Sequence, residues 1–119
     1  MQRYSFDDNE LINLLKDKIP EIKQFIYPEM EFSAFIHFGL FGGFLRDYIM
    51  KNEGKNELTV RSFEFINDLF ENGDERIQTM LRVEAFELLT DFQKTIDTSK
   101  AYLKGKALEN FIDVIKLIK

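Results

Sequence analysis

The spacing of hydrophobic residues along the chain is helical almost throughout. Between Leu108 and Ile118, apolar side chains recur at intervals of three and four residues, which is the repeat of a helix with one buried face. Phe63, Ile66 and Phe70 repeat the same spacing earlier in the chain. No segment alternates apolar and polar residues for long enough to indicate a strand. The pattern predicts an all-α fold, a compact bundle of five to seven helices around one core, with residues 1–119 forming a single helical domain.

Local signals divide the first half of the chain into predicted helices. Asp7 followed by Glu10 is typical of a capping box, so a helix is expected to start there and continue to Ile19. Pro20 ends this helix or opens a short one that Pro28 breaks. A long apolar helix is expected over about residues 32–50, followed by a polar connection over residues 51–56 that contains Gly54.

The second half of the chain is predicted to contain helices over about residues 57–71, 75–92, 101–103 and 106–118. Gly73 suits a left-handed helix stop, and Asp74 suits the cap of the next helix. Residues 75–92 carry apolar side chains nearly all round the helix, which indicates a central and largely buried element. Residues 97–99 (Asp-Thr-Ser) are expected to cap the short helix that follows them.

The charge balance changes the range of functions that this helical domain can have. The chain of 119 residues has a net charge of −5, and residues 61–91 hold eight acidic and three basic side chains. Proteins that bind nucleic acid concentrate positive charge against the phosphates. The composition therefore argues against direct binding of DNA or RNA.

The sequence also argues against membrane insertion and secretion. The first residues contain no apolar segment of the kind found in signal peptides. The longest apolar stretch, residues 32–45, is interrupted by polar residues and glycines and is too short to span a bilayer. The absence of cysteine excludes disulfides and thiolate metal sites. We expect a cytoplasmic protein with no cofactor and no metal.

Catalytic chemistry has few candidate residues. His37 is the only histidine, and its neighbours Ile36 and Phe38 indicate a packing role more than that of a general base. Gly39, Gly42 and Gly43 lack the strand and the lysine that accompany phosphate-binding loops, so they indicate a close helix–helix approach or a helix break. We expect no catalytic residue, and hence no enzyme.

Phenylalanine is abundant, with thirteen residues, and five of them recur every third position from Phe32 to Phe44. One interpretation is core packing, because each ring removes a large apolar area from water. The alternative is a helical regulator or a binding module that holds a small apolar ligand in the Phe-rich segment 32–49.

Carboxylates on the two predicted helices around Gly73 form the second candidate site. Three of them follow helical spacing before Gly73, two surround the connection, and three follow helical spacing after it. The eight candidate partner-binding residues are Glu64, Asp68, Glu71, Asp74, Glu75, Glu84, Glu87 and Asp91. A tight helical hairpin could place all of them on one surface. Such residues usually form a solvated face, but uncompensated like charges also favour a docking surface for a basic partner.

Five segments resemble those of a known group of proteins. They span residues 42–48 (GGFLRDY), 63–69 (FEFINDL), 73–78 (GDERIQ), 83–89 (VEAFELL) and 101–105 (AYLKG). This pattern resembles small all-helical bacterial immunity proteins from toxin–immunity systems, such as those of contact-dependent growth inhibition. The resemblance implies a non-enzymatic inhibitor that binds one cognate toxin at 1:1. A basic nuclease toxin, possible examples being tRNA-cleaving enzymes, would match an acidic surface electrostatically.

Overall fold

Helices follow one another along nearly all of residues 3–52 and 56–118, the part of the chain that the computed structural model describes. The described elements are α1 (Asp8–Lys18), the 3₁₀ helix η1 (Pro20–Phe25), α2 (Ala34–Lys51), α3 (Glu57–Asn72), α4 (Glu75–Met80), the π-helix η2 (Leu81–Phe86), α5 (Glu87–Leu89), α6 (Gln93–Tyr102) and α7 (Gly105–Ile118). The predicted all-α bundle of five to seven helices is confirmed. Gly54, in the predicted polar connection, lies outside the described residues.

Side-chain caps determine where several helices begin. The Asp7 carboxylate accepts a hydrogen bond from the Glu10 amide at 3.0 Å, and Asp74 accepts one from the Ile77 amide at 3.0 Å. Both caps were predicted from the sequence. Asn56 caps α3 in the same way by accepting a hydrogen bond from the Thr59 amide at 3.0 Å. Each cap satisfies an amide that would otherwise have no partner in the first turn of its helix.

The predicted helix stop at Gly73 is confirmed, but its predicted conformation and the predicted cap at residues 97–99 are wrong. Gly73 has φ −96°, so the chain leaves α3 in an extended conformation and not in a left-handed one. Glycine is still required there, because a Cβ would collide with the Leu69 carbonyl and the Ile77 side chain. Residues 97–99 do not cap a helix either: α6 already begins at Gln93, where the Thr95 hydroxyl accepts a hydrogen bond from the Phe92 amide at 3.3 Å.

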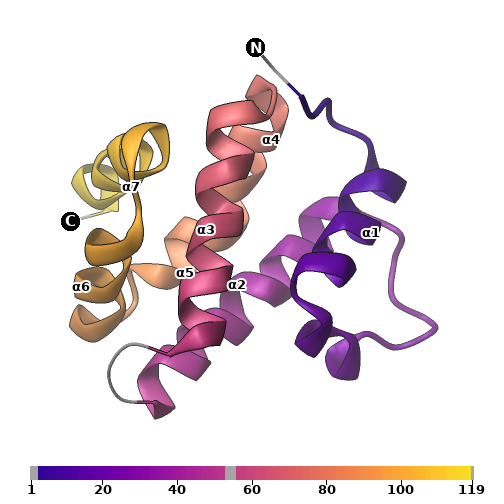
Figure 1. Cartoon of the computed structure of the whole chain (residues 1–119), viewed down its shortest axis with the longest axis horizontal. Helices are drawn as coiled ribbons and strands as arrows, with labels where there is room; N and C mark the ends of the chain where they lie inside the picture. The colour runs from indigo at the N-terminus through magenta and orange to yellow at the C-terminus, as the bar shows by residue number, and fades with distance from the viewer. Residues whose placement is uncertain (1–2, 53–55, 119) are drawn as a thin grey trace.

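Figure 1 shows how the elements are arranged in space. The helix α3 crosses the middle of the molecule, with α1 on one side and α7 on the other (Figure 1). The consecutive segments α4, η2 and α5 continue in one direction behind α3, and α2 crosses this path. The two helices that carry the predicted carboxylates, α3 and the α4–η2–α5 path, therefore pack on each other with different faces turned to solvent.

Aromatic rings connect the helices across the core. Phe70 of α3 stacks on Phe86 of η2 with ring centroids 5.2 Å apart, and Phe86 meets Phe111 of α7 edge to face at 5.2 Å. Phe38 and Phe41 of α2 are also fully buried. These contacts support the core-packing interpretation for much of the Phe-rich segment. They also confirm a central path over residues 75–92, except that Val83 and Phe92 are exposed.

The helices α2 and η2 approach each other closely where they cross. A Cβ on Gly42 would lie 2.8 Å from the Cα of Ala85 and 3.0 Å from the Glu84 carbonyl oxygen. The glycine therefore lets the two backbones touch, as one interpretation of the glycine cluster predicted. A side chain at position 42 would force two buried helices apart, because neither contact atom belongs to a flexible side chain.

We predict that Gly42→Ala lowers the free energy of unfolding by about 1–3 kcal/mol, the usual cost of overpacking a buried contact. Urea denaturation followed by circular dichroism measures this change. Gly39→Ala is the matched control, because its Cβ would meet only the mobile end of the Glu84 side chain. It should be neutral or slightly stabilising, since alanine is the better helix former. Equal stability of the two variants would contradict the assigned crossing.

Candidate partner-binding site

The eight predicted carboxylates do not share one surface. Glu64 and Asp68 line a hollow beside Asp17 and Lys18 of α1. Glu84 lies against α2, with its Oε1 atom 2.8 Å from where a Gly39 Cβ would be. The hairpin therefore does not gather the eight carboxylates on one surface: they lie near three different neighbours, which are the segment before α1, α2 and α7.

Asp68 and Asp74 hold the segment before α1 in place. Asp68 accepts hydrogen bonds from Arg3 at 3.0 Å and from the Tyr4 hydroxyl at 2.7 Å. The second contact raises the pKa of Tyr4, because the neighbouring carboxylate favours the protonated phenol. Asp74 accepts a hydrogen bond from the Phe6 amide at 2.7 Å in addition to capping α4. Both carboxylates therefore stabilise the fold, a role that their spacing in the sequence does not reveal.

Glu71 and Asp91 also have partners within the chain. Glu71 accepts a hydrogen bond from the Lys106 amide at 3.3 Å, at the start of α7. Asp91 forms an ion pair of 2.6 Å with Arg46, which also contacts Asp47 at 3.0 Å. These hydrogen bonds to Asp47 and Asp91 raise the pKa of the Arg46 guanidinium. The sequence-based assumption that these charges are uncompensated is wrong for Asp68 and Asp91, which form ion pairs with Arg3 and Arg46.

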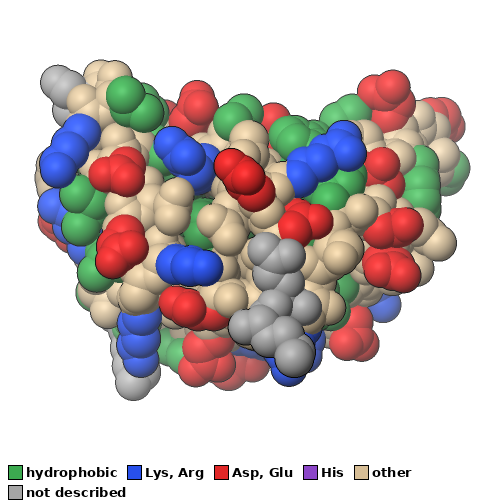
Figure 2. All heavy atoms as spheres, turned by 90° about the horizontal axis from the view of Figure 1, so that it is seen from above, with side chains coloured by type: hydrophobic (Ala, Val, Ile, Leu, Met, Phe, Trp, Pro, Cys, Tyr) green, Lys and Arg blue, Asp and Glu red, His purple; other side chains and the backbone are tan. Residues whose placement is uncertain are grey.

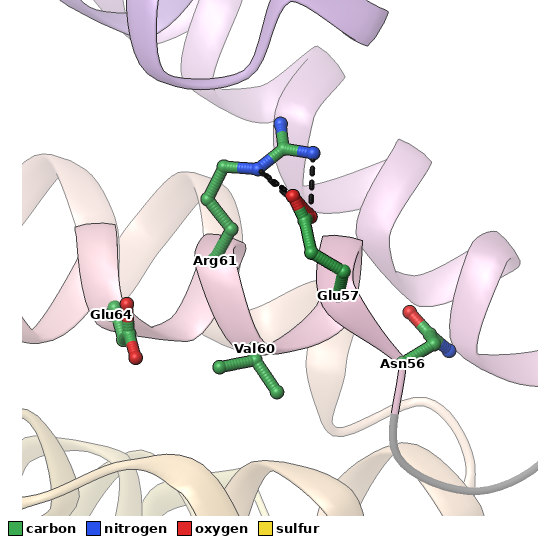
Figure 3. Close-up of a pocket in the computed structure, with 5 residues that line it drawn as sticks. All are labelled: Asn56, Glu57, Val60, Arg61 and Glu64. Atoms are coloured by element: carbon green, nitrogen blue, oxygen red, sulfur yellow. Dashed lines mark hydrogen bonds and ion pairs between the residues drawn. The ribbon is translucent and has the colours of Figure 1, made fainter.

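Glu64 lies on the exposed face of α3 between two hollows. One of about 520 Å³ is lined by Asn56, Glu57, Val60, Arg61 and Glu64 (Figure 3). Glu57 and Arg61 point toward each other, and Glu64 points away from them (Figure 3). Arg61 also binds Glu21 at 2.7 Å, and this hydrogen bond lowers the pKa of Glu21. Glu64 itself has no hydrogen bond or ion pair to the part of the chain that the structure describes.

Glu84 and Glu87 are the predicted carboxylates with the least compensation. Glu84 is half-buried beside Gly39 and forms no hydrogen bond or ion pair with any residue in the described ranges. Burial raises its pKa, and the negative charge of Glu87 raises it further. Glu75 and Glu87 are exposed and likewise have no polar partner among residues 3–52 and 56–118.

Glu87 also lines a groove that the sequence analysis missed. The groove has a volume of about 290 Å³ and lies between the α4–η2–α5 path and α7, lined by Thr79, Arg82, Val83, Glu87, Val114, Leu117 and Ile118. The sequence carried one signal for it: Leu117 lies outside the predicted apolar stripe of α7. Val83 was assigned to the interior because its helix is apolar nearly all round.

Charges of both signs cover one face of the molecule. Figure 2 shows acidic and basic side chains interspersed over most of that face, with acidic groups gathering toward the side that α1 occupies in Figure 1. This face of the molecule is therefore not uniformly acidic. Recognition of a basic partner would therefore depend on particular carboxylates.

His37 is buried, and its Nδ1 atom lies 2.8 Å from the Ser33 carbonyl oxygen, which agrees with the predicted packing role. Within the described ranges, no three acidic or histidine side chains come together in a way that could hold a metal ion. None of the described helices has the length and apolar character needed to cross a membrane.

The fold and these surfaces define an all-α domain with separated clefts and half-buried carboxylates. The chain belongs to the family described as a domain of unknown function (DUF7674), whose model matches residues 12–116. No curated protein and no solved structure matches the chain.

We predict that Glu84→Gln stabilises the protein at neutral pH. The folded state raises the pKa of Glu84, so its stability falls as pH rises through that pKa and the carboxylate ionises. The glutamine variant does not ionise and so does not lose this stability. The variant and the unmodified protein should have similar stability below the ordinary glutamate pKa of about 4.3. Melting temperatures recorded between pH 4 and pH 8 measure the difference. Glu109→Gln, at an exposed position of α7, should show no such divergence.

Asp74→Ala should lower the free energy of unfolding by about 1–2 kcal/mol, because α4 loses its cap and the Phe6 amide loses its acceptor. Chemical denaturation at pH 7 measures the loss. Glu75→Ala removes the neighbouring exposed carboxylate and should cost clearly less. A neutral effect of Asp74→Ala would contradict its structural assignment.

Proposed function

We propose that this domain is a non-enzymatic immunity protein that acts in the cytoplasm and neutralises a basic nuclease toxin by binding it at 1:1. The function is the one that the resemblance implies, but the proposed contact surface contains fewer of the eight carboxylates than the sequence predicted. The carboxylates that stabilise the fold are left out, and the uncompensated ones, above all Glu84 and Glu87, become the proposed contacts.

The observation that carries this proposal is the state of Glu84. A half-buried carboxylate without a polar partner, next to a second carboxylate, destabilises the free protein. A lysine or arginine from a partner would remove both the desolvation penalty and the repulsion from Glu87. An arrangement that is unfavourable in the free protein and favourable in a complex is typical of a binding site.

The acidic composition supports the same partner class. A net charge of −5 accelerates association with a basic protein through long-range attraction. Inhibition by occupying a nuclease surface needs no nucleophile, metal or cofactor in the inhibitor. Binding and exclusion are sufficient for this function.

A second candidate function is the binding of a small apolar ligand beside the Phe-rich segment. A groove of about 290 Å³ between η1 and α2 is lined by Phe25, Leu40, Phe44, Asp47, Tyr48 and Lys51. Phe25 is 46% exposed there, so part of an aromatic surface is open to solvent. A small molecule released from the purified protein on denaturation would favour this candidate over the inhibitor.

A protection assay tests the proposed function. The C-terminal domain encoded by the reading frame immediately upstream is expressed in a laboratory bacterium, with and without this chain. We expect growth arrest with loss of intact RNA, relieved when this chain is present. An upstream domain that is harmless, or an arrest that this chain does not relieve, would contradict the proposal.

Charge variants then locate the contact. Glu87→Lys should weaken toxin binding about tenfold and make the affinity less sensitive to salt, because one attractive charge becomes repulsive. Isothermal titration calorimetry at two salt concentrations measures both the affinity and its sensitivity to salt. Glu10→Lys is the matched control, since Glu10 is exposed and α1 lies on the opposite side from α7 (Figure 1). Equal losses for the two variants would indicate only a general effect of net charge.

A further inference from the structure

The groove between the α4–η2–α5 path and the end of α7 is apolar at its centre. Val83 is 46% exposed, Leu117 is 79% exposed and Ile118 is 49% exposed. These three side chains line one groove together with Val114. Isolated exposed apolar residues are ordinary on a protein surface, but several that converge on one concave site are typical of a contact region.

The edge of this groove is acidic on the side that faces α2. Glu87 lines the groove and is close enough to Glu84 to raise the pKa of that residue. Asp113 is exposed one turn before Leu117, so it lies beside the groove on the α7 side. Arg82 is the one cation that lines it among the described residues. The lining therefore holds one acidic and one basic side chain, and Glu84, three residues before Glu87, adds a second carboxylate next to the groove.

We propose that this groove docks a short amphipathic helix of the basic partner, with an apolar stripe flanked by lysine or arginine. The apolar stripe would cover Val83, Leu117 and Ile118 and so remove them from water. The flanking cations would reach Glu87 and Glu84, which have no polar partner among the described residues of the free protein. An apolar centre with a polar edge is the common anatomy of a protein interface, and helix-in-groove binding is a recurrent form of it.

This inference rests on the proposed function for the identity of the partner, but the chemistry of the groove can be tested separately. The probe is a helical model peptide of leucine and lysine, titrated into ¹⁵N-labelled protein and followed by amide chemical shifts. We expect shifts concentrated at residues 79–87 and 114–118. A peptide of leucine and glutamate with the same apolar pattern should produce none, because the acidic edge repels it.

Two variants and their controls assign the contacts. Leu117→Asp should weaken binding of the lysine peptide by about tenfold or more, the effect of losing one buried apolar side chain. Phe32→Asp replaces another exposed apolar residue, which lies before α2, and should change the affinity less than about twofold. Arg82→Gln removes the one groove cation and should strengthen binding. Circular dichroism checks that each variant is folded.

Several outcomes would overturn the inference while leaving the proposed function intact. Peptide shifts outside the groove would do so, as would a toxin affinity that Leu117→Asp leaves unchanged. Self-association of the free protein that Leu117→Asp abolishes would assign the groove to a second copy of this chain. Failure of the protection assay, with groove-specific binding of the lysine peptide, would remove the proposed function and keep the groove as a site for basic amphipathic helices.

Discussion

The contact between Gly42 and Ala85 is the constraint on which the arrangement of the other helices depends. Without a side chain at position 42, the backbones of α2 and η2 meet directly at the centre of the molecule. The π-helical turn from Leu81 to Phe86 lies at this crossing. A π-helical segment shifts the later residues around the helix axis relative to an α-helix. It thus determines which side chains after Leu81 face the core and which face solvent.

That shift also connects the fold to the proposed site. Phe86 points inward and contacts rings of both α3 and α7, whereas Val83 is exposed and Glu84 lies over Gly39. The Glu84 carboxylate lies beside the helix crossing and near a second carboxylate, and it is partly shielded from water. The groove beside it, the exposed end of α7 and the raised pKa of Glu84 are therefore consequences of one packing arrangement.

Much of the fold could be predicted because local signals and periodicity agree. The caps at Asp7 and Asp74 and the α7 helix after Gly105 follow from residue types and spacing alone. The candidate site was harder to predict because its charges depend on distant partners. Nothing near Asp68 in the sequence indicates that Arg3 and Tyr4 will bind it, and spacing alone does not pair Asp91 with Arg46. Val83 was also assigned to the interior, because apolar residues lie nearly all round its helix and their spacing does not show which side stays open to solvent.

The hydrogen bonds around Gly73 have a consequence for the order of events during synthesis on the ribosome. Hydrogen bonds join residues 3–6 to Asp68, Asn72 and Asp74, so these contacts can form only after a segment more than sixty residues later has been synthesised. The helix α1 can form as soon as it emerges, because its own cap precedes it. Its approach to the rest of the molecule cannot be completed until α3 and the start of α4 have left the exit tunnel. A pause in translation before that point would allow α1 to pack on η1 and α2 but would leave exposed the part of its apolar face that packs on α3.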